Sequence, residues 1–403
     1  MKLSTTSIQN DTILKKRKIL FIILPYLITH RDSISSKISS YKAFPYGVLS
    51  IASYIKNQLE DNIDVQMLDC NLYSDTNYIA AINEKLIALN PDIVGISMMF
   101  DNSYKYLKEI TRSIKKYNKD ILITLGGAAA TPSYSIILKE QDYIDSICYS
   151  EGEIPFLNLL KSSNIIEYLD NDNSWVTKKS LNKNVIPEKT VVNNLDDIIN
   201  IDYSFIDVSQ YEMKEAFSPF SDMRIDGKQF FILTSRGCPF SCTFCSHSGD
   251  SDKKIRFASV NRIIKHVDFL VSKYNLKVLS INDDQILFNK KRAKQLFTEL
   301  AKFNIRIECP LGFSVTFMDN ELIGLMKNAG MDTAILAIES GSSYVLKQIM
   351  NKPLKLKKVK PIVQELRKYN FWVQGFFVSG MPGETDDHRE ETLKFIKDVG
   401  IDW

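Results

Sequence analysis

The sequence lacks a strong charge of either sign, an apolar run long enough to cross a membrane, and a fourth cysteine close to its three closely spaced ones. Lysine and arginine number 51 and the acidic residues 48, so the formal net charge is only +3. Such a balance gives no reason to expect a nucleic-acid or membrane partner. The few cysteines fit a reducing compartment, and we expect a cytoplasmic protein.

The basic run Lys15–Lys18, followed by the apolar run Ile19–Leu24, resembles the start of a signal peptide. The apolar run is short, however, and no small-residue cleavage site follows it. A long stretch of alternating apolar and amphipathic segments comes next. We therefore predict that Ile19–Leu24 belongs to a buried parallel strand.

Three cysteines, Cys238, Cys242 and Cys245, follow one another at spacings of four and three residues. Thiolates so placed on one loop can hold three corners of a cubic iron–sulfur cluster and leave its fourth iron open. A zinc site with His247 as fourth ligand is the alternative, although four ligands within ten residues leave little chain to cross-link. The other cysteines lie in or beside predicted strands and are expected to be buried: Cys70, Cys148 and Cys309.

The cysteine spacing, the aromatic Phe244 before the last cysteine and the preceding apolar strand Phe230–Thr234 resemble the radical S-adenosylmethionine (SAM) superfamily. In that family three cysteines bind a four-iron, four-sulfur (4Fe-4S) cluster, and the amino and carboxylate groups of SAM chelate the fourth iron. One electron then splits SAM into methionine and a 5'-deoxyadenosyl radical. The resemblance implies an electron donor such as flavodoxin or ferredoxin.

The first half of the chain, residues 17–165, alternates short apolar runs with amphipathic stretches, which predicts an α/β fold with a doubly wound, Rossmann-like sheet. Ligands of such sheets bind at the carboxyl ends of the strands. The predicted strands are Lys18–Leu24, Asp64–Leu68, Ile93–Ser97, Ile121–Leu125 and Ser146–Tyr149.

Two of these strand ends carry Ser97 and the pair Gly126–Gly127, and this spacing resembles the cobalamin-binding domain. The resemblance implies that Ser97, Gly126 and Gly127 line the slot for the nucleotide tail of cobalamin. The later string Tyr149–Glu153, which contains Gly152 and Glu153, resembles the version of this domain that is fused ahead of radical SAM domains.

The segment Lys42–Gly47 departs from the cobalamin-binding pattern, because Phe44 occupies the place of the histidine that would ligate cobalt from below. Phenylalanine has no lone pair to offer a metal. We therefore expect cobalt to be bound without a protein histidine. His30, the single histidine in this half, is predicted to be a solvated surface residue.

Residues 166–228 are rich in Asn, Asp and Lys and are predicted to form a linker. From 229 to 403 strand and helix patterns alternate again, which predicts a partial TIM-like barrel with active residues at the carboxyl ends of its strands. Radical SAM enzymes resemble a partial barrel of six units, and we count five here. The sixth strand would begin near Gly400, so we expect a truncated form or a partner that completes the barrel.

Several residues at these strand ends match the SAM contacts of the family. Asp283 and Asp284 fall where the family contacts the SAM amino group, and Glu339 and Ser340 fall where it meets the ribose and carboxylate. The remaining candidates are Phe244 and Gly380 near the adenine and, more weakly, Ser314. Each acid has an alternative interpretation, since carboxylates at strand ends often only cap the next helix.

Together these features predict a cobalamin-dependent radical SAM enzyme with a 4Fe-4S cluster, SAM and cobalamin as cofactors. The commonest reaction of that group is methyl transfer to an unactivated carbon, here of a small molecule or a natural-product precursor. Two alternatives stay open. One is a cobalamin-assisted cyclisation or rearrangement without methyl transfer, and the other is a non-catalytic, cofactor-binding fragment that needs a partner.

Overall fold

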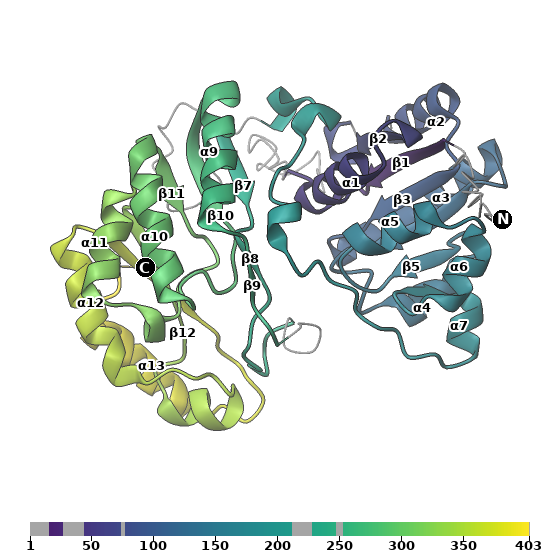
Figure 1. Ribbon diagram of the computed structural model, residues 1–403. Coiled ribbons are helices and arrows are strands. Elements are labelled where there is room, and N and C mark those ends of the chain that lie inside the picture. Colours follow the sequence, from purple (N-terminus) through teal and green to yellow (C-terminus); the bar gives the residue numbers. More distant parts are fainter. Residues whose placement is uncertain (1–15, 27–43, 74–76, 212–227, 247–252, 403) are drawn as a thin grey trace, which may run out of the picture. The chain divides into compact units, whose positions relative to one another are not determined.

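The computed structural model describes residues 16–26, 44–73, 77–211, 228–246 and 253–402 (Figure 1). The chain divides into two compact units. The first comprises Met1–Val192 with Ile201–Asp207, and the second comprises Asn193–Asn200 with Val208–Trp403. No helix of the described ranges is long and apolar enough to span a membrane.

The first unit is built on a six-stranded sheet with the order β2-β1-β3-β4-β5-β6, in which only β6 runs antiparallel to its neighbour. Its doubly wound α/β architecture confirms the prediction. The strands are β1 Arg17–Ile23, β2 Ile63–Asp69, β3 Ile93–Ser97, β4 Leu122–Gly126, β5 Ser146–Cys148 and β6 Trp175–Thr177. The helices are α1 Tyr46–Leu59, α2 Tyr78–Leu89, α3 Leu107–Tyr117, α4 Tyr134–Glu140, α5 Glu153–Lys161, α6 Ile165–Asn171 and α7 Lys178–Asn182.

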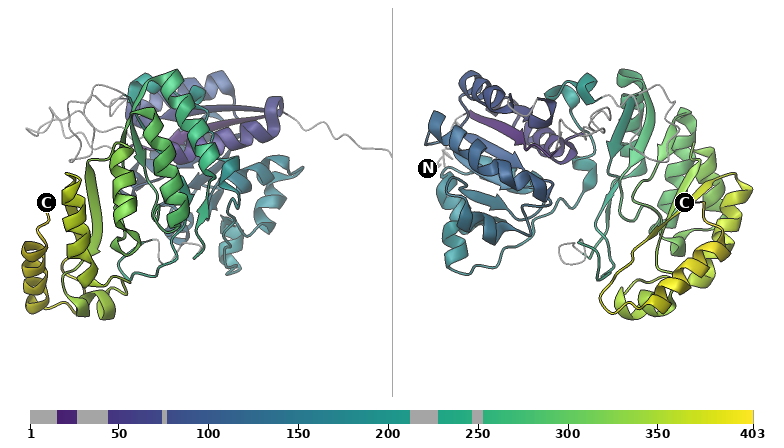
Figure 2. Two further views of the ribbon diagram at one scale, coloured as in Figure 1. Left: turned by 60° about the vertical axis from the view of Figure 1, so that its left-hand side comes forward. Right: turned by 180° about the vertical axis from the view of Figure 1, so that it is seen from behind.

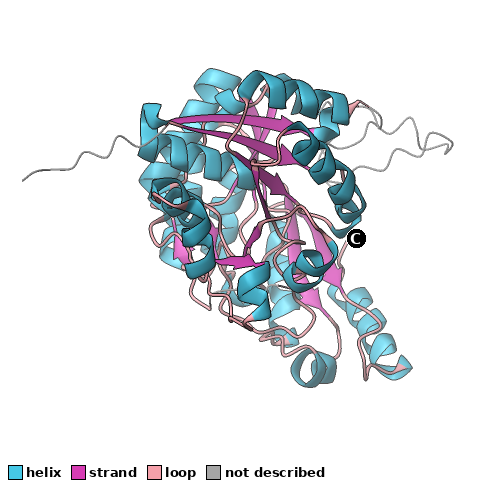
Figure 3. Cartoon of the chain, turned by 90° about the vertical axis from the view of Figure 1, so that its right-hand side faces the viewer, coloured by secondary structure: helices cyan, strands magenta, loops and turns pink. Residues whose placement is uncertain are grey.

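Helices cover both faces of this sheet (Figure 3). Successive residues of β1 point to opposite faces, as in any strand. Leu20 and Ile22 join one apolar cluster with residues of α2, α3 and α4. Phe21 points to the other face and packs edge-on against Phe156 of α5, with ring centroids 5.2 Å apart. The continuous apolar run of β1 is therefore explained by burial on both sides.

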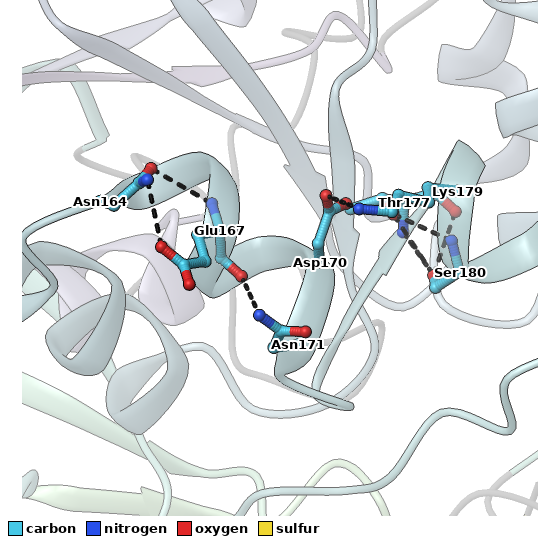
Figure 4. A network of polar contacts seen from close by, with 7 residues as sticks. All are labelled: Asn164, Glu167, Asp170, Asn171, Thr177, Lys179 and Ser180. Atoms are coloured by element: carbon cyan, nitrogen blue, oxygen red, sulfur yellow. Dashed lines mark hydrogen bonds and ion pairs between the residues drawn. The ribbon is translucent and has the colours of Figure 1, made fainter.

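The segment after α5 adds to this sheet instead of leaving it. Asn164 caps α6, Thr177 and Ser180 form a capping box at the start of α7, and Lys179 pairs with Asp170 at 2.7 Å (Figure 4). Between the two helices β6 pairs with β5. The first unit thus extends beyond residue 165, where the sequence predicted the start of a linker.

The second unit holds five parallel strands, alternating with helices that lie along one side of them (Figure 2). A single bridge, Phe313 to Leu336, joins the three-stranded and two-stranded parts. The strands are β7 Lys228–Ile232, β10 Leu276–Ile281, β11 Arg306–Glu308, β12 Thr333–Glu339 and β13 Trp372–Phe377. The helices are α9 Val260–Tyr274, α10 Lys290–Leu300, α11 Asn320–Asn328, α12 Val359–Lys368 and α13 Asp386–Val399.

The last described residues lie beside β13. The backbone N–H of Asp402 donates to the carbonyl of Val373 at 2.9 Å, and the N–H of Val373 donates to the Asp402 carboxylate at 2.8 Å. The chain therefore returns to the edge of β13 at the point where the sequence predicts the next strand to begin.

Candidate functional site

The cysteine loop leaves the second sheet through a narrow neck. Two short antiparallel strands, β8 Ser235–Arg236 and β9 Arg256–Phe257, close the loop at its base. Gly237 follows with a φ of +97°, a backbone conformation that favours glycine. At the far side, the N–H of Thr243 donates to the carbonyl of Met350 at 3.0 Å, so the segment after β12 supports the loop.

The three cysteines of this loop are free thiols, with Cys242 buried and Cys238 and Cys245 half-buried. Burial raises the pKa of Cys238 and of Cys242, and the nearby Cys245 raises both further. No group of three or more His, Cys, Asp or Glu side chains in the described ranges is gathered closely enough to hold a single metal ion. His247, the ligand of the alternative zinc site, lies outside these ranges.

Asp283 holds the base of the loop. Its buried carboxylate accepts hydrogen bonds from the backbone N–H of Thr234 at 2.6 Å, the hydroxyl of Thr234 at 2.5 Å and the hydroxyl of Ser235 at 2.7 Å. Burial raises the pKa of this carboxyl, while these hydrogen bonds and Arg292 act in the opposite direction. Because its oxygens already have protein donors, Asp283 is a positioning residue for the loop.

Arg292, a residue that sequence reasoning missed, completes this neck from α10. Its guanidinium donates to the carbonyls of Thr234 at 2.8 Å and Ala258 at 3.1 Å, and it lies over the ring of Phe257. It therefore ties together the two chain segments that enter and leave the loop. No sequence signal identified it, because its partners lie 58 and 34 residues away.

Asp284, the next residue, is only half-buried, and its carboxylate raises the pKa of Cys238. Gln285 hydrogen-bonds to the same thiol. Of the two adjacent acids, Asp284 is thus the one whose side chain borders the cysteines and is accessible to a ligand.

Glu339, at the end of β12, forms a second charged group beside the loop. Lys352 donates to its carboxylate at 3.0 Å, and both side chains are largely buried. This pair lies near Cys242, whose pKa is lowered by Lys352 and raised by Glu339. Glu339 has a φ of +72°, which costs a non-glycine residue of the order of 1–3 kcal/mol and is typical of functional sites. The sequence did not identify Lys352.

The remaining candidates of this unit differ in accessibility. Phe244 packs against the buried group Val345, Leu346 and Met350. Ser340 is fully buried, and its hydroxyl bonds to Thr392 of α13 at 3.2 Å, which gives it a packing role. Gly380 and Ser314 remain accessible. Gly380 has a φ of +87°, with open space where a Cβ would stand, and Ser314 is half-buried.

In the first unit, Ser97 and Gly126 are direct neighbours at the carboxyl ends of β3 and β4. The strand order reverses between β1 and β3, and ligands of doubly wound sheets bind at this point. A Cβ on Gly126 would stand at an ordinary 3.7 Å from Cys148, so packing does not require a glycine there. A Cβ on Gly127, by contrast, would stand 2.5 Å from the carbonyl oxygen of Met98.

Three other candidates of this unit have packing contacts. A Cβ on Gly152 would stand 2.4 Å from Ile51 of α1, and the buried carboxylate of Glu153 accepts a hydrogen bond from Ser50 at 2.5 Å. Phe44 is buried edge-on against Tyr203, with centroids 6.0 Å apart. The first two contacts join α1 to the start of α5. The third joins the residues before α1 to the segment Ile201–Asp207. His30 lies outside the described residues.

Comparison with known families matches both units. Residues 232–396 match the radical SAM superfamily, and residues 40–160 match the B12 binding domain.

Three relatives extend over most of the chain, each at 26% identity. An uncharacterized methyltransferase of Pyrococcus horikoshii aligns over 97% of this chain and 80% of its own length. Cytidylyl-2-hydroxyethylphosphonate methyltransferase of Streptomyces wedmorensis aligns over 81% and 65%. The anaerobic magnesium-protoporphyrin IX monomethyl ester cyclase of Rubrivivax gelatinosus aligns over 89% and 62%. The chain thus spans less than two thirds of the last two relatives.

Two solved structures share the fold. The radical SAM methyltransferase TsrM of Kitasatospora setae, with cobalamin and a [4Fe-4S] cluster bound, matches 96% of this chain and 74% of its own with a TM-score of 0.69 and 14% identity. The cobalamin-dependent radical enzyme OxsB, with aqua-cobalamin and SAM bound, matches 95% and 52% with a TM-score of 0.71 and 19% identity. At these identities the similarity shows the fold alone.

Proposed function

Because this chain belongs to the cobalamin-dependent radical SAM family, in which a B12 binding domain precedes a radical SAM domain, we propose that it transfers a methyl group to an unactivated carbon of a small molecule. The observation that carries the proposal is the cysteine loop. Three free thiols lie within eight residues of one another on it, and charged groups from the ends of β10 and β12 border them. When bound, the cluster supplies an electron to SAM and cobalamin carries the methyl group.

We assign the cluster to Cys238, Cys242 and Cys245. Their free thiols suit iron, which binds the deprotonated form. Burial raises the pKa of Cys242, and the ammonium group of Lys352 acts in the opposite direction. The neck formed by β8 and β9 fixes the loop at its base. This donor set leaves the fourth iron of a cubic cluster for a ligand that is not part of the loop.

We assign SAM to Asp284 and to the charged pair of Lys352 and Glu339, which border these cysteines. Asp284 offers a carboxylate to the amino group of SAM, and Lys352, paired with Glu339, offers a cation to its carboxylate. Phe244 and Gly380 would border the adenine, with Ser314 as a weaker contact. Asp283 and Ser340 serve this site indirectly, since protein hydrogen bonds already occupy them.

We assign the nucleotide tail of cobalamin to Ser97, Gly126 and Gly127. Ser97 is half-buried at the point where the strand order reverses, and packing within the protein does not require a glycine at position 126. A bulky ligand can therefore approach the backbone of β4 closely. Gly152 and Glu153 would support this edge through the packing of α5 on α1.

Anaerobic incubation of the reconstituted protein with methyl-labelled SAM and a fractionated small-molecule extract tests the proposed function. Label in a new product, with 5'-deoxyadenosine formed alongside it, supports methyl transfer. A new product without label favours the second candidate, a cyclisation or rearrangement. The similarity to the cyclase of Rubrivivax gelatinosus supports this candidate. No SAM cleavage under reducing conditions would contradict both and favour the cofactor-binding fragment.

Substituting the glycines separates a cobalamin role from a packing role. Gly126→Ala is expected to change the free energy of unfolding by less than about 0.5 kcal/mol, because its methyl group meets only Cys148 at 3.7 Å. Cobalamin binding is expected to weaken, because the methyl group would stand between the ligand and the backbone of β4. Gly152→Ala is the matched control. Its methyl group would stand 2.4 Å from the terminal Cδ1 of Ile51, so that side chain must shift and a cost of about 1 kcal/mol is expected. Unchanged cobalamin affinity in the folded Gly126→Ala protein would contradict the assignment.

The lower face of cobalt is the subject of another prediction. Phe44 stands in place of a ligating histidine, so electron paramagnetic resonance of bound cob(II)alamin is expected to show cobalt lines without splitting by an axial nitrogen. Triplet splitting would mean that His30 or the base of cobalamin itself coordinates. In that case the role of Phe44 would be limited to its packing against Tyr203.

A further inference from the structure

The outer edge of the cysteine loop adjoins an unusually basic segment. The 25 residues from Ser340 to Gln364 contain six lysines and no acidic residue. Two of these lysines are engaged, Lys352 with Glu339 and Lys360 with Asp398. The other four are exposed and form no ion pair with any residue in the described ranges: Lys347, Lys355, Lys357 and Lys358.

This basic segment is held against the loop by specific contacts. The side-chain amide of Asn351 donates to the carbonyl of Ser241 at 3.1 Å, and the Thr243 hydroxyl donates to the carbonyl of Ile349 at 2.7 Å. Leu354 and Leu356 pack against the buried group that also contacts Phe244. These two leucines are half-buried, whereas the neighbouring Lys355 and Lys357 are exposed. From the other side of the loop, Lys253 reaches Ser241 at 2.5 Å.

Three phenylalanines form an apolar contact group beside these lysines. Phe240 of the loop, Phe288 and Phe317 lie with ring centroids 5.2–6.4 Å apart. The Phe288 side chain is 40% exposed. Thr316, next to Phe317, bonds to the carbonyl of Pro353 at 3.3 Å, which joins the aromatic group to the basic segment. Aromatic residues surrounded by charged ones are typical of the centre and rim of a protein interface.

We propose that this surface, formed by Phe240, Phe288, Phe317 and the lysines 347, 355, 357 and 358, is the docking site of an acidic one-electron carrier protein. The inference rests on the proposed function, in which an electron must reach the cysteine loop from outside. Unpaired lysines attract an acidic partner and speed its encounter with the surface. The exposed side chains of Ser241 and Thr243 mark the accessible edge of the loop at the same place.

Binding of an acidic flavodoxin to the purified protein, residues 1–403, measured by calorimetry, tests the proposal without any need for catalysis. The triple variant Lys355→Glu, Lys357→Glu, Lys358→Glu is expected to bind about tenfold or more weakly at low ionic strength, and the difference should shrink in high salt. Phe288→Ser is expected to weaken binding at both salt concentrations.

A matched control uses the exposed basic residues of α3 and the turn before it, in the first unit. Lys105→Glu, Lys108→Glu, Lys116→Glu makes the same change in net charge and is expected to bind flavodoxin like the unmodified chain. Equal weakening by both triple variants, loss in the control alone, or no binding by the unmodified chain would overturn the proposal. SAM cleavage with dithionite, a reductant that needs no docking, should be equal in all variants. If no variant and no unmodified protein cleaved SAM with dithionite, the proposed function would be contradicted. The docking site would still be tested by the flavodoxin binding measurement alone.

Discussion

Replacing Cys242 by alanine is expected to remove nearly all iron from the anaerobically reconstituted protein. The unmodified chain should be brown and carry about four irons, as expected for one cubic cluster, whereas two remaining thiolates cannot hold it. The same loss is expected for Cys238→Ala and Cys245→Ala. Iron and sulfide analysis with an absorption spectrum measures the effect, and SAM cleavage should fall to background in parallel.

Cys309 and Cys148 provide the controls, since both are buried and free. Burial raises the pKa of Cys148 to about 12 and that of Cys309 well above its usual range, so both remain unreactive thiols. Their alanine variants should retain the iron content of the unmodified protein. Tight zinc binding without charge-transfer absorption would contradict the cluster and support the site with His247.

Elements with long, continuous patterns were predicted well from the sequence. The strand Ile93–Ser97 has the predicted bounds, and Lys18–Leu24 is observed one residue earlier as Arg17–Ile23, because burial of both strands is recorded in their continuous apolar runs. Short elements were not predicted from the sequence. β6 has three residues and β8 and β9 have two each, which is too few for a periodicity to be visible. Their positions depend on pairing with distant segments of the chain.

Within the site, the sequence identified the loop and its bordering strand ends but not the long-range contacts. Lys352 and Arg292 act on the cysteines and on the neck through tertiary contacts, and no local pattern marks them. Asp283 and Asp284 could not be distinguished, because both follow the same strand. Only the structure shows that one is turned into the neck and the other toward Cys238.

Removal of the Asp283 carboxylate is expected to be the most destabilising single change in the second unit. Asp283→Ala would leave the N–H and hydroxyl of Thr234 and the hydroxyl of Ser235 without their buried acceptor, and would remove the negative charge near the buried Arg292. Breaking such a buried charged network costs about 3–5 kcal/mol. Hydrogen–deuterium exchange of peptides from 228–258 and 276–300 would report this loss locally, separately from the first unit.

Asp284→Ala is the matched variant. Its carboxylate has no comparable set of buried donors, so the free energy of unfolding should change by less than about 0.5 kcal/mol. SAM binding should weaken instead, with the cluster retained. If Asp283→Ala were as stable as Asp284→Ala and lost only SAM affinity, Asp283 would contact SAM directly and its positioning role would be refuted.

The pH dependence of stability provides an independent test of Asp283. Because burial raises the pKa of its carboxyl above the ordinary 3.8, the folded chain binds a proton more readily than the unfolded chain in the window between these two values. Stability contributed by this group is therefore fully present below pH 3.8 and is lost as the pH rises through the raised value. Asp283→Asn carries no titrating group, so the stability difference between it and the unmodified chain should change across that window and be constant above it. A difference that stays constant throughout would mean that the hydrogen bonds from Thr234 and Ser235 offset the effect of burial completely.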